Sequence, residues 1–363
     1  MRAAVYHGPN DVRFEQVEDP VPGPGELLID VATVGICGTD VAEYVNEPHF
    51  FPVTERHPHS GHLGPTIPGH EFSGFVSGVG AGVEGFSIGD LVASGAGVAC
   101  GVCPPCVRGA TNLCTSYWTV GLHTHGAMAE KVVVPASCCL NVADSNIAPD
   151  LAALAQPMSI ALHAVRRGRL SADDLVLIVG VGGIGSFLTY CASAQGAEVI
   201  AVDLDQGRLD MAMALGATRA LLVSASDEPG DRLIDGDRQP TLAFECTAAP
   251  GPLKMAIRVV ADNGRVVVVG HQPRPIEFDF KVLTFGEKEM IGTMAHAYAA
   301  DFNDAVDLVN RRPDVWSHLA PTVHPLEDLV TAGLLPMAEH RQNQVKTLFD
   351  PSLREPRPIH TRT

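Results

Sequence analysis

The segment 175–194 constrains the fold most, because twenty nearly uncharged residues have the length of a membrane span or of a buried strand and helix. Residues 175–179 read Leu-Val-Leu-Ile-Val, a β-branched run of strand length. Glycines in 180–185 interrupt this run before the helix-compatible residues 186–195. We therefore predict a buried strand, a glycine turn and a helix here, and no membrane span.

The glycine turn has the spacing G-x-G-x-x-G, a weak signal alone that gains specificity from the strand before it and the helix after it. Gly180 would permit the tight turn, Gly182 would let the backbone approach a pyrophosphate, and Gly185 would allow close packing of the helix. The helix N-terminus, which includes Gly183 and Ile184, would offer free N–H groups to the phosphates. The turn therefore predicts a dinucleotide site.

A second predicted strand ends in Asp203, eighteen residues after Gly185. A carboxylate there would accept hydrogen bonds from the adenosine ribose and repel a 2′-phosphate, which favours NAD over NADP. Arg208 could face the adenine, weaken this preference by turning towards the ribose, or be a solvated helix residue. Without Asp203, a flavin or nucleotide-sugar site would carry more weight.

The length of 363 residues predicts two domains, because a single hydrophobic core stops growing below this size. Residues 1–156 read as short strands punctuated by Gly and Pro, which indicates a β-rich domain. Residues 157–297 alternate buried strands with helices, as in a parallel sheet covered on both faces. Residues 298–363 begin with an amphipathic helix and are expected to complete the first domain. The predicted fold class is α/β.

Four of the nine cysteines form a C-x2-C-x2-C-x7-C cluster, made of Cys100, Cys103, Cys106 and Cys114. Structural zinc is held tetrahedrally by thiolates, so this cluster predicts one structural zinc ion. A group of buried, metal-free thiols is the alternative, which the regular spacing argues against.

A second candidate metal site consists of Cys37 with His70 and Glu71. Catalytic zinc has fewer, mixed protein ligands and one open position, through which it polarises an alcohol oxygen and lowers the pKa of the hydroxyl. Glu71 would bind directly or lie just behind the metal. Asp40 would fix the tautomer of His70, and the Thr39 hydroxyl would transfer the proton. A lone Cys or His is usually a core residue. The glycine-rich surroundings of Cys37 and His70 are what support the metal-site hypothesis here.

The strings Gly-Ile-Cys-Gly-Thr-Asp at 35–40 and Gly-His-Glu-Phe-Ser-Gly at 69–74, with the thiol cluster and the glycine turn, resemble the zinc-dependent medium-chain alcohol and polyol dehydrogenases. The resemblance covers residues 1 to about 352. Residues 43–58 are similar to an insertion of butanediol dehydrogenases, which have sorbitol and threonine dehydrogenases as relatives. The resemblance implies a GroES-like catalytic domain, a Rossmann domain with the active site in the cleft between them, and a homodimer or homotetramer joined through the Rossmann sheets.

The same resemblance implies further cofactor contacts. It assigns a cofactor-phosphate contact to Lys346, within Val-Lys-Thr-Leu at 345–348. It also assigns nicotinamide contacts to the surroundings of Cys246, Gly270 and Thr293.

Two positions depart from the pattern of these relatives. Ala42 stands where they usually carry a histidine that relays the proton to solvent. Gln156, before Pro157, stands where they carry a glutamate near or on the zinc. Without this carboxylate the metal would be a stronger Lewis acid, but the site would bind it less tightly. Four histidines crowd the insertion and are candidates to replace the relay: His49, His57, His59 and His62.

The formal charge of −17 and the lack of a clustered basic run argue against nucleic-acid and anionic-membrane partners. The N-terminus lacks the apolar stretch of a signal peptide, so we expect a cytoplasmic protein. The predicted activity is NAD(H)-dependent, zinc-dependent interconversion of a small secondary alcohol or vicinal diol with its ketone. A polyol or aminoalcohol dehydrogenase is the nearest alternative. A catalytically silent zinc- and NAD-binding structural or sensor protein is the alternative of another class.

Overall fold

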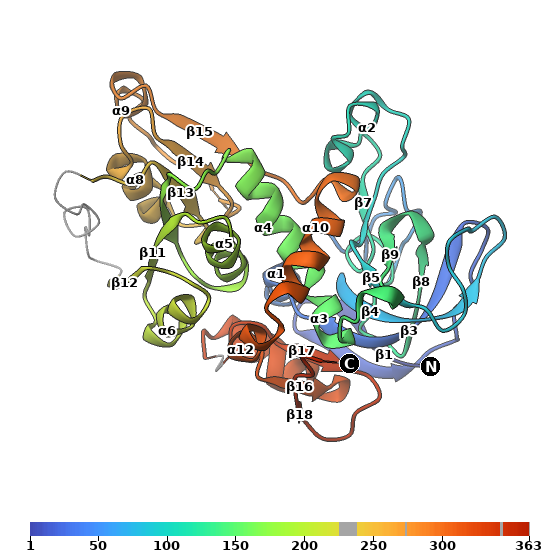
Figure 1. Cartoon of the computed structure of the whole chain (residues 1–363). Coiled ribbons are helices and arrows are strands. Elements are labelled where there is room, and N and C mark those ends of the chain that lie inside the picture. The colour runs from blue at the N-terminus through green and yellow to red at the C-terminus, as the bar shows by residue number, and fades with distance from the viewer. Residues whose placement is uncertain (225–237, 273, 342–343, 363) are drawn as a thin grey trace. The chain divides into compact units, whose positions relative to one another are not determined.

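The computed structural model of this protein describes residues 1–224, 238–272, 274–341 and 344–362. The chain folds as two compact units (Figure 1). Unit 1 comprises Met1–Ser159 and His296–Thr363, and unit 2 comprises Ile160–Ala295. The C-terminal segment therefore belongs to the same unit as the N-terminal strands.

Unit 2 is built on a six-stranded sheet in the order β12-β11-β10-β13-β14-β15, with every neighbouring pair parallel. The order reverses direction between β10 and β13, which makes the carboxyl ends of these two strands the topological switch point. The strands are β10 (Leu175–Val179), β11 (Glu198–Asp203), β12 (Arg219–Leu222), β13 (Leu242–Glu245), β14 (Arg265–Val268) and β15 (Glu289–Gly292).

Helices cover this sheet and connect its strands, as Figure 1 shows. Helix α5 packs along β10 and β11, α6 along β11 and β12, and α8 along β13 and β14. All five residues of β10 are buried, which explains its unbroken apolar sequence. The helices are α5 (Gly183–Ala194), α6 (Gln206–Ala214), α8 (Pro250–Val259) and α9 (Lys281–Phe285). The predicted strand, glycine turn and helix are confirmed. None of the helices in the described residues has the length and apolarity needed to cross a membrane.

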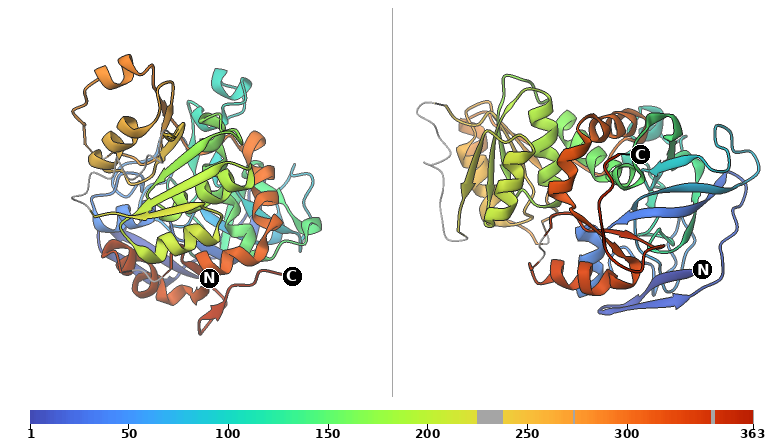
Figure 2. Two further views of the ribbon diagram at one scale, coloured as in Figure 1. Left: turned by 60° about the vertical axis from the view of Figure 1, so that its left-hand side comes forward. Right: turned by 60° about the horizontal axis from the view of Figure 1, so that its bottom comes forward.

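Unit 1 contains an eight-stranded sheet in the order β18-β16-β17-β3-β4-β5-β9, with β8 also paired to β3. Strands β16 to β18 come from the C-terminal segment, drawn in red in Figure 2, and β17 pairs with the N-terminal strand β3. The sheet strands are β3 (Glu26–Gly35), β4 (Glu71–Val79), β5 (Leu91–Ser94), β8 (Lys131–Pro135), β9 (Cys139–Asn141), β16 (Thr322–Pro325), β17 (Leu348–Asp350) and β18 (Arg357–Pro358).

Two further strand pairs and several helices complete unit 1. A hairpin of β1 (Arg2–Gly8) and β2 (Asp11–Gln16) is antiparallel, as is the pair β6 (Gly97–Val98) and β7 (Trp118–Thr119). The helices are α1 (Gly38–Val45), α2 (Pro104–Val107), α3 (Pro149–Ala153), α10 (Tyr298–Arg311), α11 (Trp316–Leu319) and α12 (Leu335–Ala338), while α4 (Ala155–Arg167) begins in unit 1 and ends in unit 2. The sheet of unit 1 and the parallel, helix-covered sheet of unit 2 confirm the predicted α/β fold class.

Candidate metal and cofactor sites

Three strand ends bring the first candidate site together. Gly35, the last residue of β3, lies opposite Glu71 at the start of β4 and opposite Leu348 at the start of β17. The chain continues from β3 into Cys37, which precedes α1, and His70 directly precedes β4. Backbone pairing therefore places residues near positions 36, 70 and 346 at the same end of one sheet.

The potential ligand atoms of Cys37, His70 and Glu71 all lie within 4.8 Å of one another. His70 and Glu71 are buried and Cys37 is half-buried. Asp40 is also buried, and its Oδ1 lies 3.7 Å from His70 Nδ1. Its Oδ2 accepts a hydrogen bond of 2.9 Å from the backbone N–H of Cys37, which ties α1 to this cysteine. With Nδ1 turned towards Asp40, Nε2 is the nitrogen of His70 left to bind a metal.

The chemistry of this group suits a cation. Asp40 Oδ1 and His70 Nδ1 are buried and form no hydrogen bond with any part of the chain that the structure describes. Burial alone would lower the pKa of His70, but the charge of Asp40 and the contact with Cys37 raise it to about 9. Burial raises the pKa of Asp40. These shifts reflect buried acidic groups and sulfur around one imidazole, and thiolate, imidazole and carboxylate are the ligands that zinc prefers.

Lys346 forms a buried ion pair with Glu71 Oε2, a contact that the sequence did not reveal. Its ammonium group also donates a hydrogen bond of 2.8 Å to the Ile36 carbonyl. A side chain at Gly35 would come within 2.7 Å of the same carboxylate oxygen, so glycine is needed there. Lys346 thus balances the charge of Glu71 behind the candidate metal site. Its contact with the cofactor phosphate stays a prediction.

Two other predicted residues occupy the same unit. The Thr39 hydroxyl lies 3.8 Å from Cys37 Sγ, on the first turn of α1. Gln156 is buried on the first turn of α4. Their roles in proton transfer and in tuning the metal stay predictions.

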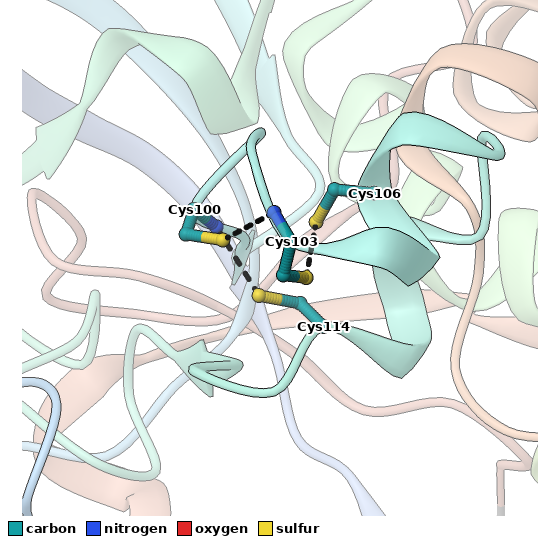
Figure 3. A group of neighbouring side chains, drawn as sticks. All are labelled: Cys100, Cys103, Cys106 and Cys114. Carbon is teal, nitrogen blue, oxygen red and sulfur yellow. Dashed lines mark hydrogen bonds between the residues drawn. The ribbon is translucent and has the colours of Figure 1, made fainter.

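The four cysteines of the second cluster converge in one lobe of unit 1 (Figure 3). Cys103 caps the short helix α2, whose first residues are both proline, and Cys106 lies within that helix. The sulfurs of Cys103 and Cys106 are 3.4 Å apart, and the ligand atoms of all four lie within 4.8 Å of one another. This arrangement fits a tetrahedral thiolate site.

Backbone N–H groups point at these sulfurs. Cys100 Sγ accepts from the N–H of Cys103 at 3.4 Å, and Cys114 Sγ accepts from Cys100 and Ser116 at 3.3 Å each. Backbone N–H donors also lower the pKa of Cys103 to about 6. Such donors stabilise thiolates, the form in which cysteine binds zinc.

The glycine turn of unit 2 has the conformation that a dinucleotide requires. Gly180 adopts a φ of +86°, which favours glycine, and a side chain at Gly185 would come within 1.9 Å of the Gly180 carbonyl. By contrast, the nearest atom to a side chain at Gly182 would be 3.8 Å away, and Gly183 faces open space. The turn is therefore closed towards the sheet and open where a pyrophosphate would lie at the start of α5, which includes Ile184.

Asp203 ends β11 and is buried beside this turn. Its carboxylate accepts hydrogen bonds from the backbone N–H groups of Val181 at 2.9 Å, Leu204 at 2.8 Å and Asp205 at 3.1 Å. Arg208 Nη1 lies 3.7 Å from Oδ1 of the same carboxylate. The structure thus brings Asp203 and Arg208 together, and their roles in cofactor selection stay predictions.

The residues assigned to the nicotinamide follow three adjacent strands. Cys246 directly follows β13 and donates its backbone N–H to the Val179 carbonyl at 2.9 Å. Gly270 lies two residues after β14, and its N–H donates to the Glu245 carbonyl at 2.9 Å. Thr293 directly follows β15, and its hydroxyl forms no hydrogen bond within the described ranges. All three lie at the carboxyl edge of the sheet, although their contact with cofactor stays a prediction.

The chain matches the alcohol dehydrogenase GroES-like domain over residues 23–144 and the zinc-binding dehydrogenase domain over residues 183–311. It is 30% identical over 363 residues to (R,R)-butanediol dehydrogenase of Neisseria gonorrhoeae. This alignment covers 97% of this chain and 100% of that protein. The chain belongs to the zinc-dependent alcohol dehydrogenase family. Membership confirms the resemblance seen in the sequence and makes the chain an oxidoreductase of CH–OH groups.

Solved structures of alcohol dehydrogenases have the same fold as this chain. The crystal structure of 2R,3R-butanediol dehydrogenase from Bacillus subtilis matches with a TM-score of 0.87 and 30% identity, over 97% of this chain and 99% of that chain. The E. coli alcohol dehydrogenase RspB, solved with NADH, matches with a TM-score of 0.85 and 26% identity, over 96% and 99%. The zinc-binding family, the two ligand clusters and the open glycine turn together support two zinc ions and a nicotinamide cofactor for this dehydrogenase.

The histidines of the insertion form pairs with a second loop of unit 1. His57 stacks on His123 with ring centroids 4.4 Å apart, and His62 meets His125 edge-on at 4.5 Å. Backbone N–H groups donate to Nδ1 of His123 from Thr119 at 2.9 Å and to Nδ1 of His125 from Ile67 at 3.2 Å. These loop histidines therefore have structural partners, which no local sequence signal indicated.

Proposed function

We propose that this dehydrogenase transfers a hydride between NAD(H) and a small secondary alcohol or vicinal diol, which it interconverts with the ketone or hydroxyketone. The observation that carries the proposal is the group of Cys37, His70 and Glu71. When bound there, zinc would polarise the alcohol oxygen, and NAD would accept the hydride. Similarity to two butanediol dehydrogenases supports the diol.

The residues of the first site have distinct roles in this proposal. Cys37 and His70 hold the metal, and Asp40 fixes the ring of His70 through Nδ1. Thr39, whose hydroxyl lies 3.8 Å from Cys37 Sγ, would relay the proton that the alcohol releases, by accepting it at Oγ1 while it passes its own hydroxyl proton on towards solvent. Lys346 stabilises Glu71 as a buried carboxylate by pairing with it.

Gln156 would set the charge of the metal site in this proposal. As a neutral amide in place of a carboxylate, it leaves one negative charge fewer beside the metal. We infer that the metal is then a stronger Lewis acid and is held less tightly.

We further propose that NAD is preferred to NADP and that the protein is a homodimer or homotetramer. The buried Asp203 carboxylate supports the cofactor preference, because it would repel a 2′-phosphate. Strand β15 ends the order of the six-stranded sheet in the described residues, and an edge strand of this kind can pair with a second copy. A cytoplasmic location stays a prediction from the sequence.

A substrate panel tests the activity. The purified protein with NAD should form NADH from 2,3-butanediol and small secondary alcohols at higher kcat/KM than from sorbitol or L-threonine. Higher values with sorbitol or L-threonine would favour the polyol or aminoalcohol alternative. The absence of NADH with every alcohol in a zinc-loaded protein would contradict a catalytic role.

A further inference from the structure

Glu245 is a fully buried carboxylate that none of the roles above uses. It is the last residue of β13 and pairs with Val179, the last residue of β10. These two strands flank the point where the strand order reverses. Glu245 therefore lies at the carboxyl edge of the sheet, where open α/β sheets bind their ligands.

Thr247 and Gln272 donate hydrogen bonds to both oxygens of this carboxylate. Oε1 accepts from the Thr247 backbone N–H at 2.6 Å and also from the Thr247 hydroxyl. Oε2 accepts from the Gln272 side-chain amide at 3.1 Å. No Lys, Arg or His of the described residues forms an ion pair with it. A carboxylate buried without a counterion is unfavourable, and a cation bound near it would offset that cost.

The carboxylate joins the two loops that a nicotinamide would meet. Thr247 lies in the loop after β13, and Gln272 lies in the loop after β14, beside Gly270. A side chain at Gly270 would come within 3.1 Å of Glu245 Oε2, and one at Gly180 would come within 2.7 Å of Thr247 Cγ2. Because Asp203 marks the adenosine half of the dinucleotide on β11, the nicotinamide half lies on the β13 side of the switch point.

We propose that Glu245 is a specificity-determining residue for the redox state of the cofactor. Its charge raises the affinity for NAD⁺ and leaves the affinity for NADH nearly unchanged. The nicotinamide ring of NAD⁺ carries a positive charge, and the ring of NADH is neutral. A buried carboxylate near the ring attracts the first and not the second, and such attraction is strong at low dielectric. Glu245 thereby favours the oxidised cofactor, the form needed for alcohol oxidation. The inference rests on the use of NAD(H) in the proposed function and not on the identity of the alcohol.

Cofactor binding to Glu245→Gln tests this proposal without turnover. The dissociation constant of NADH is measured from its fluorescence, and those of NAD⁺ and ADP-ribose are measured by competition. The dissociation constant of NAD⁺ should rise about tenfold, as expected for the loss of one charge contact of about 1.4 kcal/mol. Those of NADH and of ADP-ribose, which lacks the nicotinamide, should change about twofold or less.

Two further variants separate charge from shape. Gln272→Lys places an ammonium group beside Glu245 Oε2 and should weaken NAD⁺ relative to NADH, as Glu245→Gln does, even if Glu245→Gln fails to fold. Thr247→Val removes the two hydrogen bonds of the Thr247 hydroxyl but no charge, and it should leave the ratio of the NAD⁺ and NADH dissociation constants unchanged. Equal weakening of both cofactors in Glu245→Gln, or an unchanged ratio in Gln272→Lys, would overturn the proposal. If the unmutated protein bound neither cofactor, the proposed function itself would be wrong.

Discussion

Replacement of His123 and His125 together by asparagine should reduce the loss of stability that acidification causes. Burial, with a smaller contribution from the neighbouring His57 or His62, lowers the pKa of each histidine to about 4. The unfolded chain binds these protons near the ordinary pKa of 6.5, so between about pH 6.5 and pH 4 it holds protons that the folded protein excludes. Stability therefore falls as the pH falls through this window, and the penalty is constant below it.

The magnitude follows from the two pKa values. A histidine that titrates at 6.5 when unfolded and near 4 when folded loses about 2 kcal/mol of unfolding free energy between pH 7 and pH 5. His125 is exposed and His123 is half-buried, so solvent screening reduces the share of both, and that of His125 most. For the pair we expect about 2 kcal/mol rather than about 4. Protonation at Nδ1 would also break the backbone hydrogen bonds from Thr119 and Ile67.

Urea unfolding at pH 7 and pH 5 measures this difference. Asparagine places its Oδ1 where histidine has Nδ1, so the variant keeps an acceptor for each backbone N–H but does not titrate. The unmutated protein should lose about 2 kcal/mol more than the double variant over this interval. His59→Asn, at an exposed histidine of the same cluster, is the matched control and should behave like the unmutated protein. Equal losses in the double variant and the unmutated protein would refute the reasoning.

Three further predictions concern the metal and cofactor sites. Cys103→Ser should remove one zinc ion and lower the thermal midpoint by several degrees while changing the chemical step less; an unchanged midpoint would show that the lobe needs no metal. Asp203→Gly should narrow or reverse the preference for NAD over NADP in kcat/KM, and equal use of both cofactors by the unmutated protein would contradict the role of Asp203. Gln156→Glu should change turnover and slow the loss of zinc to a chelator without changing NAD affinity. Identical chelation and turnover would place Gln156 outside the working site.

Local constraints made parts of this molecule predictable. The glycine turn could be recognised because close approaches at Gly180 and Gly185 exclude side chains within one strand–helix connection. The thiol lobe could be recognised because its four cysteines lie within fifteen residues, so their spacing follows from the coordination geometry. The fold class followed from the same local patterns.

Contacts between distant segments could not be predicted in this way. The Lys346–Glu71 ion pair depends on the register of β17 and β4 against β3, which no single segment encodes. Stacking of His57 on His123 joins two loops with no strand periodicity. In the sequence, Glu245 looks like an ordinary strand residue. Only the pairing of β13 with β10 shows that Glu245 lies beside the glycine turn.

Zinc content and NADH formation in Cys37→Ser test the central claim most directly. The unmutated protein should contain two zinc ions per chain and form NADH from a secondary alcohol or diol. Cys37→Ser should retain one zinc ion, keep its affinity for NADH and lose nearly all NADH formation, since only the metal site of unit 1 that contains His70 and Glu71 is changed. Two zinc ions together with undiminished NADH formation in Cys37→Ser would contradict the account.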